Sequence, residues 1–170
     1  MKILITYFSQ TGNTEKIAKS IYEGCKGHEV ELKPINEVDS SSLNNYDLLF
    51  LGSGIYASRV NKSLVDLVIA ASELPSKLVF FNTHASKVPY QDGFRVVKEK
   101  IGETSEIIAE FDCCGDNIGI PEAMRNSMLE RLPPERRKEA EEHQKWLKGR
   151  PNEEDLQNAK EFAQNLLKQL

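Results

Sequence analysis

The sequence predicts a doubly wound α/β fold, with five parallel strands in the order 2-1-3-4-5 and helices on both faces of the sheet. Apolar segments alternate four times with segments of helical spacing, and this alternation implies right-handed crossovers between parallel strands. Three of the apolar segments are apolar throughout, whereas the other two alternate with charged residues. The first pattern is typical of central strands and the second of edge strands, which leads to the order given above.

The two kinds of strand can be located along the chain. The expected central strands are residues 3–7, 48–51 and 78–81. The expected edge strands are residues 29–33, which Pro34 follows, and residues 107–113. Pro34 supports an edge position because proline cannot donate a backbone hydrogen bond to a neighbouring strand. Glu110 and Asp112 interrupt the apolar residues of the last strand and indicate that one of its faces is wetter.

Helices are expected between the strands and at the end of the chain. The apolar stripes that predict them begin at Ile17, Leu64, Phe94 and Leu156. The last helix has the clearest start, because Asn152 is a suitable N-cap and three acidic residues follow it. Its apolar face is expected to continue to Leu170. Residues 40–45 are expected to form only a short or irregular helix.

Residues 1–170 are expected to form a single domain, with a charged helical insertion at residues 121–150 before the last helix. Met124 and Met128 can share one helical face in this insertion, and Trp146 and Leu147 suit a second helix. The insertion is either a solvated helical addition or a cover or docking surface at the ligand crevice.

Composition excludes several classes of protein. A net charge of −4 excludes a polycationic nucleic-acid arm, and 39% hydrophobic with 28% charged residues excludes a disordered chain. Neither a membrane-spanning apolar run nor a signal peptide is evident. Three cysteines, an odd number, argue against a disulfide framework. We therefore expect a cytoplasmic protein without nucleic-acid partners or stable membrane insertion.

A polar segment follows the first strand and leads directly into a helix. Its residues are Ser9, Gln10, Thr11, Gly12, Asn13 and Thr14. Free backbone N–H groups and the helix dipole favour a phosphate at such a place, and Gly12 allows a tight turn around the anion. Because the segment lacks the lysine of a nucleoside-triphosphate loop, a monophosphate held by neutral donors fits better. A simple N-cap rich in hydroxyl groups is the alternative.

Residues 7–14, together with Ala18 and Ile21, closely resemble the phosphate-loop signature of flavodoxins. The resemblance implies a flavodoxin-like sheet, one noncovalently bound FMN, and a low-potential electron carrier that serves redox partner proteins. A carrier of this kind needs no catalytic residue, and no spacing of cysteine and histidine residues suggests zinc or an iron–sulfur cluster. By this resemblance the phosphate is held by side chains of Ser9, Thr11, Asn13 and Thr14 and by the backbone of Gln10 and Gly12.

The strand ends are expected to place loops starting at Ser9, Ser53, Thr83 and Cys114 around one crevice, with the second and third of them around the flavin ring. The second loop contains Ser53, Gly54, Ile55 and Tyr56, and the third contains Asn82, Thr83, His84 and Ala85. Flavodoxins usually place a stacking aromatic in the second loop, which the resemblance assigns to Tyr56; a plain surface tyrosine is the alternative. His84 stands where flavodoxins often have a tyrosine; it is either a proton donor to reduced flavin or quinone, or a structural or exposed residue.

These loops also contain patterns that other kinds of site share. The Gly-x-Gly-x-x-Ala pattern from Gly52 does not predict a dinucleotide site, because it follows the third strand rather than the first. Ser9 and Gln10 stand where a response regulator needs an acidic pair, which excludes that class. The adjacent Cys113 and Cys114 are either core residues or a redox pair near the crevice.

Two functions remain as alternatives to the carrier. Residues 52–56 are similar to those of flavodoxin-like, quinone-linked protoporphyrinogen oxidases, so one alternative is an FMN-dependent oxidoreductase acting on a quinone or another small molecule. The other is a flavin-free interaction module that only keeps the fold.

Overall fold

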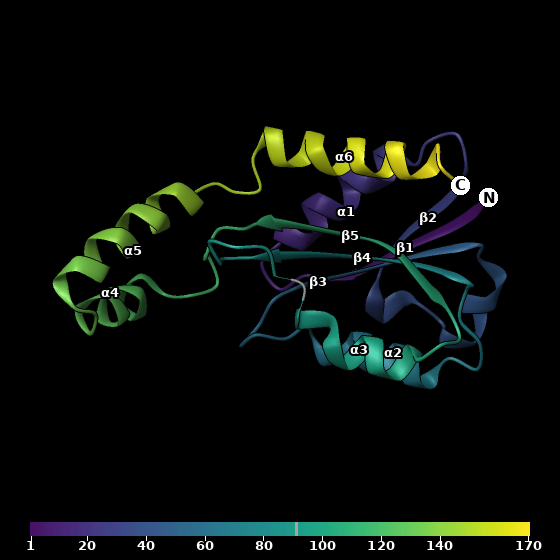
Figure 1. Ribbon diagram of the computed structural model, residues 1–170, viewed down its shortest axis with the longest axis horizontal. Helices are drawn as coiled ribbons and strands as arrows, with labels where there is room; N and C mark the ends of the chain where they lie inside the picture. Colours follow the sequence, from purple (N-terminus) through teal and green to yellow (C-terminus); the bar gives the residue numbers. More distant parts are fainter. Residues whose placement is uncertain (91) are drawn as a thin grey trace.

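The computed structural model describes residues 1–90 and 92–170 as a three-layer α/β architecture with a helical projection (Figure 1). The strands are β1 (Lys2–Phe8), β2 (Glu29–Pro34), β3 (Leu48–Gly54), β4 (Lys77–His84) and β5 (Glu106–Cys114). The helices are α1 (Asn13–Gly24), α2 (Lys62–Ala70), α3 (Arg95–Ile101), α4 (Glu122–Glu130), α5 (Pro134–Leu147) and α6 (Glu153–Leu167). Short 3₁₀ helices cover Ile35–Glu37, Ser40–Asn45 and Asp92–Phe94.

The sheet confirms the expected topology. Its strands are parallel and run in the order β2-β1-β3-β4-β5. Every residue of β3 is buried, whereas the residues of β2 and β5 are mostly half-buried. The difference follows from position, because helices cover a central strand on both faces while an edge strand keeps one side near water.

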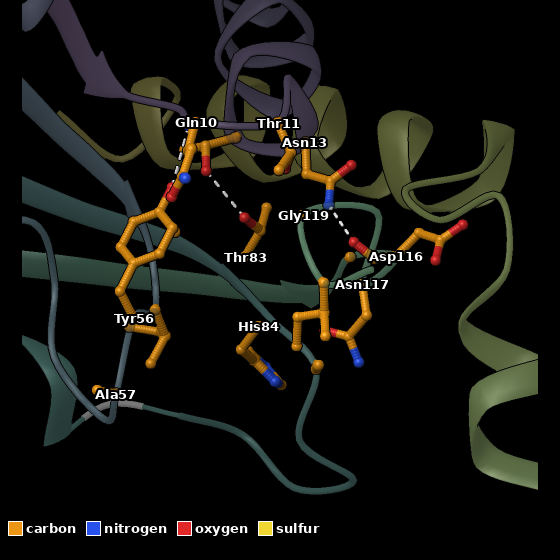
Figure 2. A pocket seen from close by; sticks show the side chains of 16 residues that line it. Gln10, Thr11, Asn13, Tyr56, Ala57, Thr83, His84, Asp116, Asn117 and Gly119 are labelled. Atoms are coloured by element: carbon orange, nitrogen blue, oxygen red, sulfur yellow. Dashed lines mark hydrogen bonds between the residues drawn. The ribbon is translucent and has the colours of Figure 1, made fainter. Parts of the chain in front are cut away.

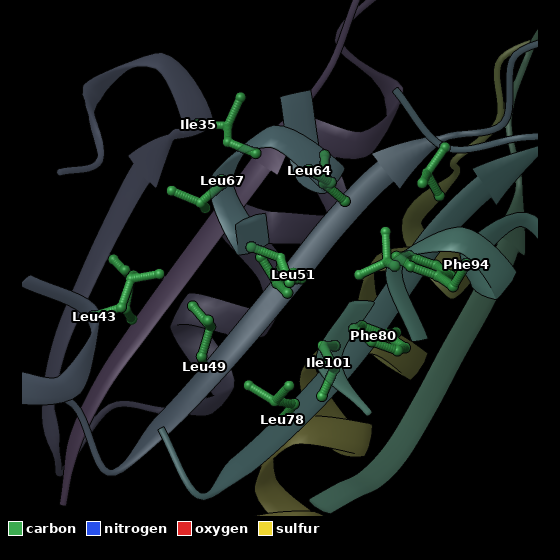
Figure 3. Close-up of a cluster of buried hydrophobic side chains, with 14 of the residues drawn as sticks. Ile35, Leu43, Leu49, Leu51, Leu64, Leu67, Leu78, Phe80, Phe94 and Ile101 are labelled. Carbon is green, nitrogen blue, oxygen red and sulfur yellow. The ribbon is translucent and has the colours of Figure 1, made fainter. Parts of the chain in front are cut away.

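Each face of the sheet has its own hydrophobic core. Helices α1 and α6 cover one face, and α2 and α3 cover the other (Figure 1). On the second face, Leu51 and Phe80 of the sheet pack with Leu64 and Phe94 of the covering segments (Figure 3). The rings of Phe80 and Phe94 are stacked, with centroids 4.4 Å apart. These alternating side chains fix which face of each strand turns towards which helix pair.

Helix α6 begins as the sequence predicts. The Asn152 side chain accepts a hydrogen bond from the Asp155 N–H at 3.0 Å, and the Asp155 carboxylate accepts one from the Asn152 N–H at 2.8 Å. The Asp155 carboxylate also pairs with Arg150 at 2.6 Å. At the other end the expectation was wrong, since the helix stops at Leu167 and Leu170 is exposed.

The segment 121–150 forms α4 and α5, which project beyond the carboxyl ends of the strands (Figure 1). The Arg137 guanidinium of α5 donates hydrogen bonds to the carbonyl groups of Leu129 and Glu130 at the end of α4, and to that of Leu132 just beyond it. These bonds join the two helices, because the last carbonyl groups of a helix lack partners within it. The expected stripe of Met124 and Met128 faces solvent.

Neither a membrane span nor a metal cluster occurs in the described part of the chain. Across residues 1–90 and 92–170, no helix combines the length and the apolar character that crossing a membrane requires. The same residues contain no group of three or more His, Cys, Asp or Glu side chains arranged to hold a metal ion.

Candidate functional site

A cavity of about 300 Å³ opens at the carboxyl ends of β1, β3, β4 and β5 (Figure 2). Parallel strands end at the same edge of a sheet, so the loops that follow them meet there, at the point where the chain switches from one side of β1 to the other. The residues that line it are Gln10, Thr11, Asn13, Thr14, Gly54, Ile55, Tyr56, Ala57, Thr83, His84, Ala85, Gly115, Asp116, Asn117, Gly119 and Ile120.

The N-terminus of α1 forms one side of this cavity. Gly12 precedes the helix in the left-handed region at φ 88°, and no side chain from the described part of the chain caps the helix. The Gly12 N–H donates to Ser9 Oγ at 3.1 Å, which holds the turn closed. The first N–H groups of α1 therefore lie beside the cavity without a cap, and the helix dipole favours an anion near them.

The polar side chains around this helix end differ in whether they already have hydrogen-bond partners within the protein. The hydroxyl groups of Thr14 and Thr83 share a hydrogen bond of 2.8 Å in a buried position. The Asn13 side-chain amide donates to the Asp116 carbonyl at 2.9 Å. Thr11 lines the cavity, and no hydrogen bond joins its hydroxyl to the rest of the described chain. Thr11 is thus the hydroxyl group beside the helix end that is not committed to a partner within the described chain.

Tyr56 forms the wall on the side of β3. Its hydroxyl accepts a hydrogen bond from the Gln10 N–H at 3.1 Å, and its ring meets Phe8 edge-on. Burial raises the pKa of Tyr56, so the hydroxyl stays protonated at neutral pH. A Cβ atom at Gly54 would lie only 2.7 Å from the Tyr56 hydroxyl oxygen, so a glycine is needed for this ring position.

Tyr56 is the first residue of a tight turn that ends at Arg59. The backbone of Tyr56 exchanges two hydrogen bonds with that of Arg59, at 2.7 and 3.1 Å. Between them Ala57 and Ser58 both have positive φ, at 47° and 67°. Residues other than glycine rarely adopt this conformation, and such strain is concentrated at functional sites.

His84 lies at the floor of the cavity with both ring nitrogens already engaged. The Ser86 N–H donates to Nδ1 at 3.1 Å, which requires that the proton of the neutral ring sit on Nε2, and Nε2 lies 2.8 Å from the Asp112 carboxylate. With these partners His84 orients the β4 loop against β5. The geometry therefore favours the structural alternative for His84 over the proton donor.

The two adjacent cysteines are not set up for thiol chemistry. Burial raises the pKa of both Cys113 and Cys114, so neither is a thiolate at neutral pH. The Cys114 thiol instead donates to the Ser86 carbonyl at 3.3 Å. This environment favours core packing over a redox pair.

Four residues expected at the site do not line the cavity, namely Ser9, Gly12, Ser53 and Asn82. Ser53 Oγ donates to the Gly54 carbonyl at 2.7 Å and accepts from the Asn61 N–H at 3.0 Å. The Asn82 amide donates to the Tyr90 carbonyl at 2.9 Å. These hydrogen bonds hold the loops in place on the side away from the cavity. A direct role of the four residues in binding a ligand stays a prediction.

The sequence predicts a loop starting at Cys114 at this crevice, but it predicts none of residues 115–120 individually, although they supply a whole wall of the cavity. The only signal was topological, since the fifth parallel strand also ends at this edge of the sheet. Gly115 and Gly119 let the loop approach the α1 turn closely. A Cβ atom would be 2.7 Å from Asn13 Nδ2 at the first position and 3.0 Å from Thr11 Cγ2 at the second.

The chain matches known proteins over nearly its whole length. A family model described as a flavodoxin domain matches residues 4–164. An uncharacterised protein of Methanocaldococcus jannaschii is 30% identical over 171 residues, which is 99% of each chain. The flavodoxin-like domain-containing protein BilS of Clostridioides difficile is 27% identical over 98% of this chain and 97% of its own. Oxidised flavodoxin 2 of Bacillus cereus has the same fold, with a TM-score of 0.66, 20% identity and complete coverage of both chains.

Proposed function

Because this chain belongs to the flavodoxin family, we propose that it binds one FMN in the cavity described above and carries electrons between redox partner proteins. The proposal treats residues 1–170 as one domain and places the protein in the cytoplasm. Its three free cysteines agree with a reducing compartment.

The observation that carries the proposal is the uncapped N-terminus of α1 beside the cavity. A phosphate monoester needs several donors and a positive potential, and the first N–H groups of α1 and the Thr11 hydroxyl supply both. The nearby Asp116 carboxylate points away from Thr11 and Asn13 and accepts the Gly149 N–H at 2.9 Å (Figure 2). The residues present therefore fit the phosphate of FMN.

The remaining walls suit a flat heterocycle. Tyr56 offers a ring on one side, and Asn117 and Gly119 lie beyond Thr83 and His84 on the other (Figure 2). The bound flavin would supply the redox chemistry, while these residues hold it, orient it and limit the access of water. Tyr56 is well placed to orient the ring, since its contacts with Gln10 and Phe8 fix its own position before any ligand enters.

One observation bears on the oxidoreductase alternative. The residues of 115–120 that line the cavity are two glycines, Asp116, Asn117 and Ile120, with no aromatic ring, so the cavity is not closed by a second stacking residue on that side. A quinone or another small molecule could approach a bound flavin there. The same opening serves a protein partner equally well, so the two functions differ in how the acceptor is recognised.

One preparation tests both parts of the proposal. The chromophore released by heat should be FMN by mass spectrometry, at one per chain, because the site provides a single anion-binding helix end. FAD in that position would contradict the proposal. The reduced protein should then pass electrons to a small quinone at a rate that rises linearly with quinone concentration. A rate that saturates would instead reveal a quinone site and favour the oxidoreductase.

A further inference from the structure

The wall at residues 115–120 is held from two directions at Asp116. The Asp116 carbonyl accepts the Asn13 side-chain amide at 2.9 Å, which joins the wall to the α1 turn. Its carboxylate accepts the Gly149 N–H at 2.9 Å, and its own N–H donates to the Arg150 carbonyl at 2.9 Å. Asp116 thus connects the anion-binding end of α1 with the junction between α5 and α6.

The carboxylate and the backbone carbonyl of Asp116 point in different directions. Figure 2 shows its carboxylate directed away from Thr11 and Asn13, while its carbonyl oxygen faces the Asn13 amide. The negative charge is therefore turned towards the α5–α6 junction and away from the donors of α1. Gly149, which makes this contact, has a positive φ of 82°, so its N–H is presented by a turn in the left-handed region that favours glycine.

Helix α5 also contacts the opposite rim of the cavity. His143 Nε2 donates to the Ala85 carbonyl at 2.8 Å, and Ala85 lines the cavity. Lys87 pairs with Glu139 at 2.6 Å, but both side chains are exposed, so this ion pair contributes little. Helix α5 consequently braces two cavity walls, one through the residues that follow it and one through His143.

We propose that Asp116 is a positioning residue for the cofactor, which transmits the support of the α5–α6 junction to the cavity wall and the α1 turn. This inference rests on the proposed function, because it concerns FMN bound in this cavity. It also gives the segment 121–150 a specific role, since the segment then holds the walls of the site in place before the cofactor binds. Preorganised walls raise affinity because less ordering remains to be done on binding.

The test is a fluorescence titration of the apoproteins with FMN. Asp116→Ala removes the acceptor for the Gly149 N–H. We expect about a tenfold loss of FMN affinity, because the lost hydrogen bond supports the cavity wall but does not contact the ligand. Asp116→Asn keeps a side-chain carbonyl acceptor and should bind FMN nearly as well as the wild type. A loss of the same size in Asp116→Asn would overturn positioning, because only the charge differs.

Matched controls make the outcome decisive. Asp39 accepts the Ser41 N–H at 2.9 Å but does not line the cavity, so Asp39→Ala should leave FMN affinity unchanged. Wild-type affinity in Asp116→Ala would overturn the inference alone, whereas a wild-type protein that binds no FMN would overturn the proposed function with it. If Asp116→Ala does not fold, His143→Ala tests the same brace, with a loss of about threefold expected. Unchanged FMN affinity in His143→Ala would then contradict the inference that α5 and the residues after it support the cavity walls.

Discussion

Thr11→Val is expected to weaken FMN binding by about 1.5–3 kcal/mol, a tenfold to hundredfold loss of affinity or more. The Thr11 hydroxyl lines the cavity beside the uncapped end of α1 and makes no hydrogen bond within the described chain. Valine has nearly the same shape but no donor, so a phosphate oxygen would lose a charge-assisted hydrogen bond. Titration of the apoprotein with FMN measures the effect.

Thr14→Val is the matched comparison, because it removes a nearby hydroxyl that is already bonded. Its Oγ1 shares a buried hydrogen bond with Thr83 Oγ1, so the change leaves the Thr83 hydroxyl without its partner. We expect a loss of about 1–3 kcal/mol in the free energy of unfolding and a smaller effect on FMN affinity than that of Thr11→Val. The reverse ranking of the two affinities would show that the phosphate contacts are assigned to the wrong hydroxyl.

Phe80→Ala should have the largest effect on stability, lowering the free energy of unfolding by about 3–5 kcal/mol. Phe80 is completely buried on β4 and is stacked on Phe94, which lies just before α3. Alanine would leave a cavity that the neighbouring strand and helix cannot fill without moving. Denaturant unfolding of the apoprotein measures the change.

Ile69→Ala serves as the control for this measurement. Ile69 lies on α2, which covers the same face of the sheet, but its side chain is 59% exposed. Truncation there should change the free energy of unfolding by less than about 0.5 kcal/mol. Equal losses in the two variants would contradict the location of the core between the sheet and the pair α2 and α3.

The topology could be predicted because the burial of a strand determines which residue types it contains. A strand covered by helices on both faces has few polar positions, and this is why residues 48–51 were recognisable as part of a central strand. The start of α6 was predictable for a similar reason. Asn152 and Asp155 make their reciprocal hydrogen bonds within one helical turn, so the local sequence contains the whole interaction.

The site could be predicted only in part, because its polar residues form hydrogen bonds with partners that are distant in the sequence. Thr14 bonds to Thr83, and Asn13 bonds to the Asp116 backbone 103 residues away. A motif shows that such side chains lie near the helix end, but not which of them still has a free donor. The same limit applies to Ser53, whose hydroxyl faces backbone groups behind the loop.

The individual residues of the loop at 115–120 could not be assigned to the site for a different reason. It has neither helical nor strand periodicity, and its glycines act through close contacts with Asn13 and Thr11 that only the folded chain reveals. Likewise Met124 and Met128 have the spacing of a buried stripe but face solvent, because α4 projects beyond the sheet that would have covered them. Spacing identifies an apolar face, and the tertiary arrangement decides whether that face is buried.

The most direct test of the central claim compares FMN with riboflavin on the wild-type apoprotein. The two ligands share the ring and the ribityl chain and differ only in the phosphate, so their affinity ratio measures the anion site at the N-terminus of α1. With about three charge-assisted hydrogen bonds of about 1.5 kcal/mol each, FMN should bind one to one and on the order of a thousandfold more tightly than riboflavin. Equal affinities for the two ligands would contradict the anion site at the N-terminus of α1, and no binding of FMN would contradict the assignment of this cavity as a flavin site.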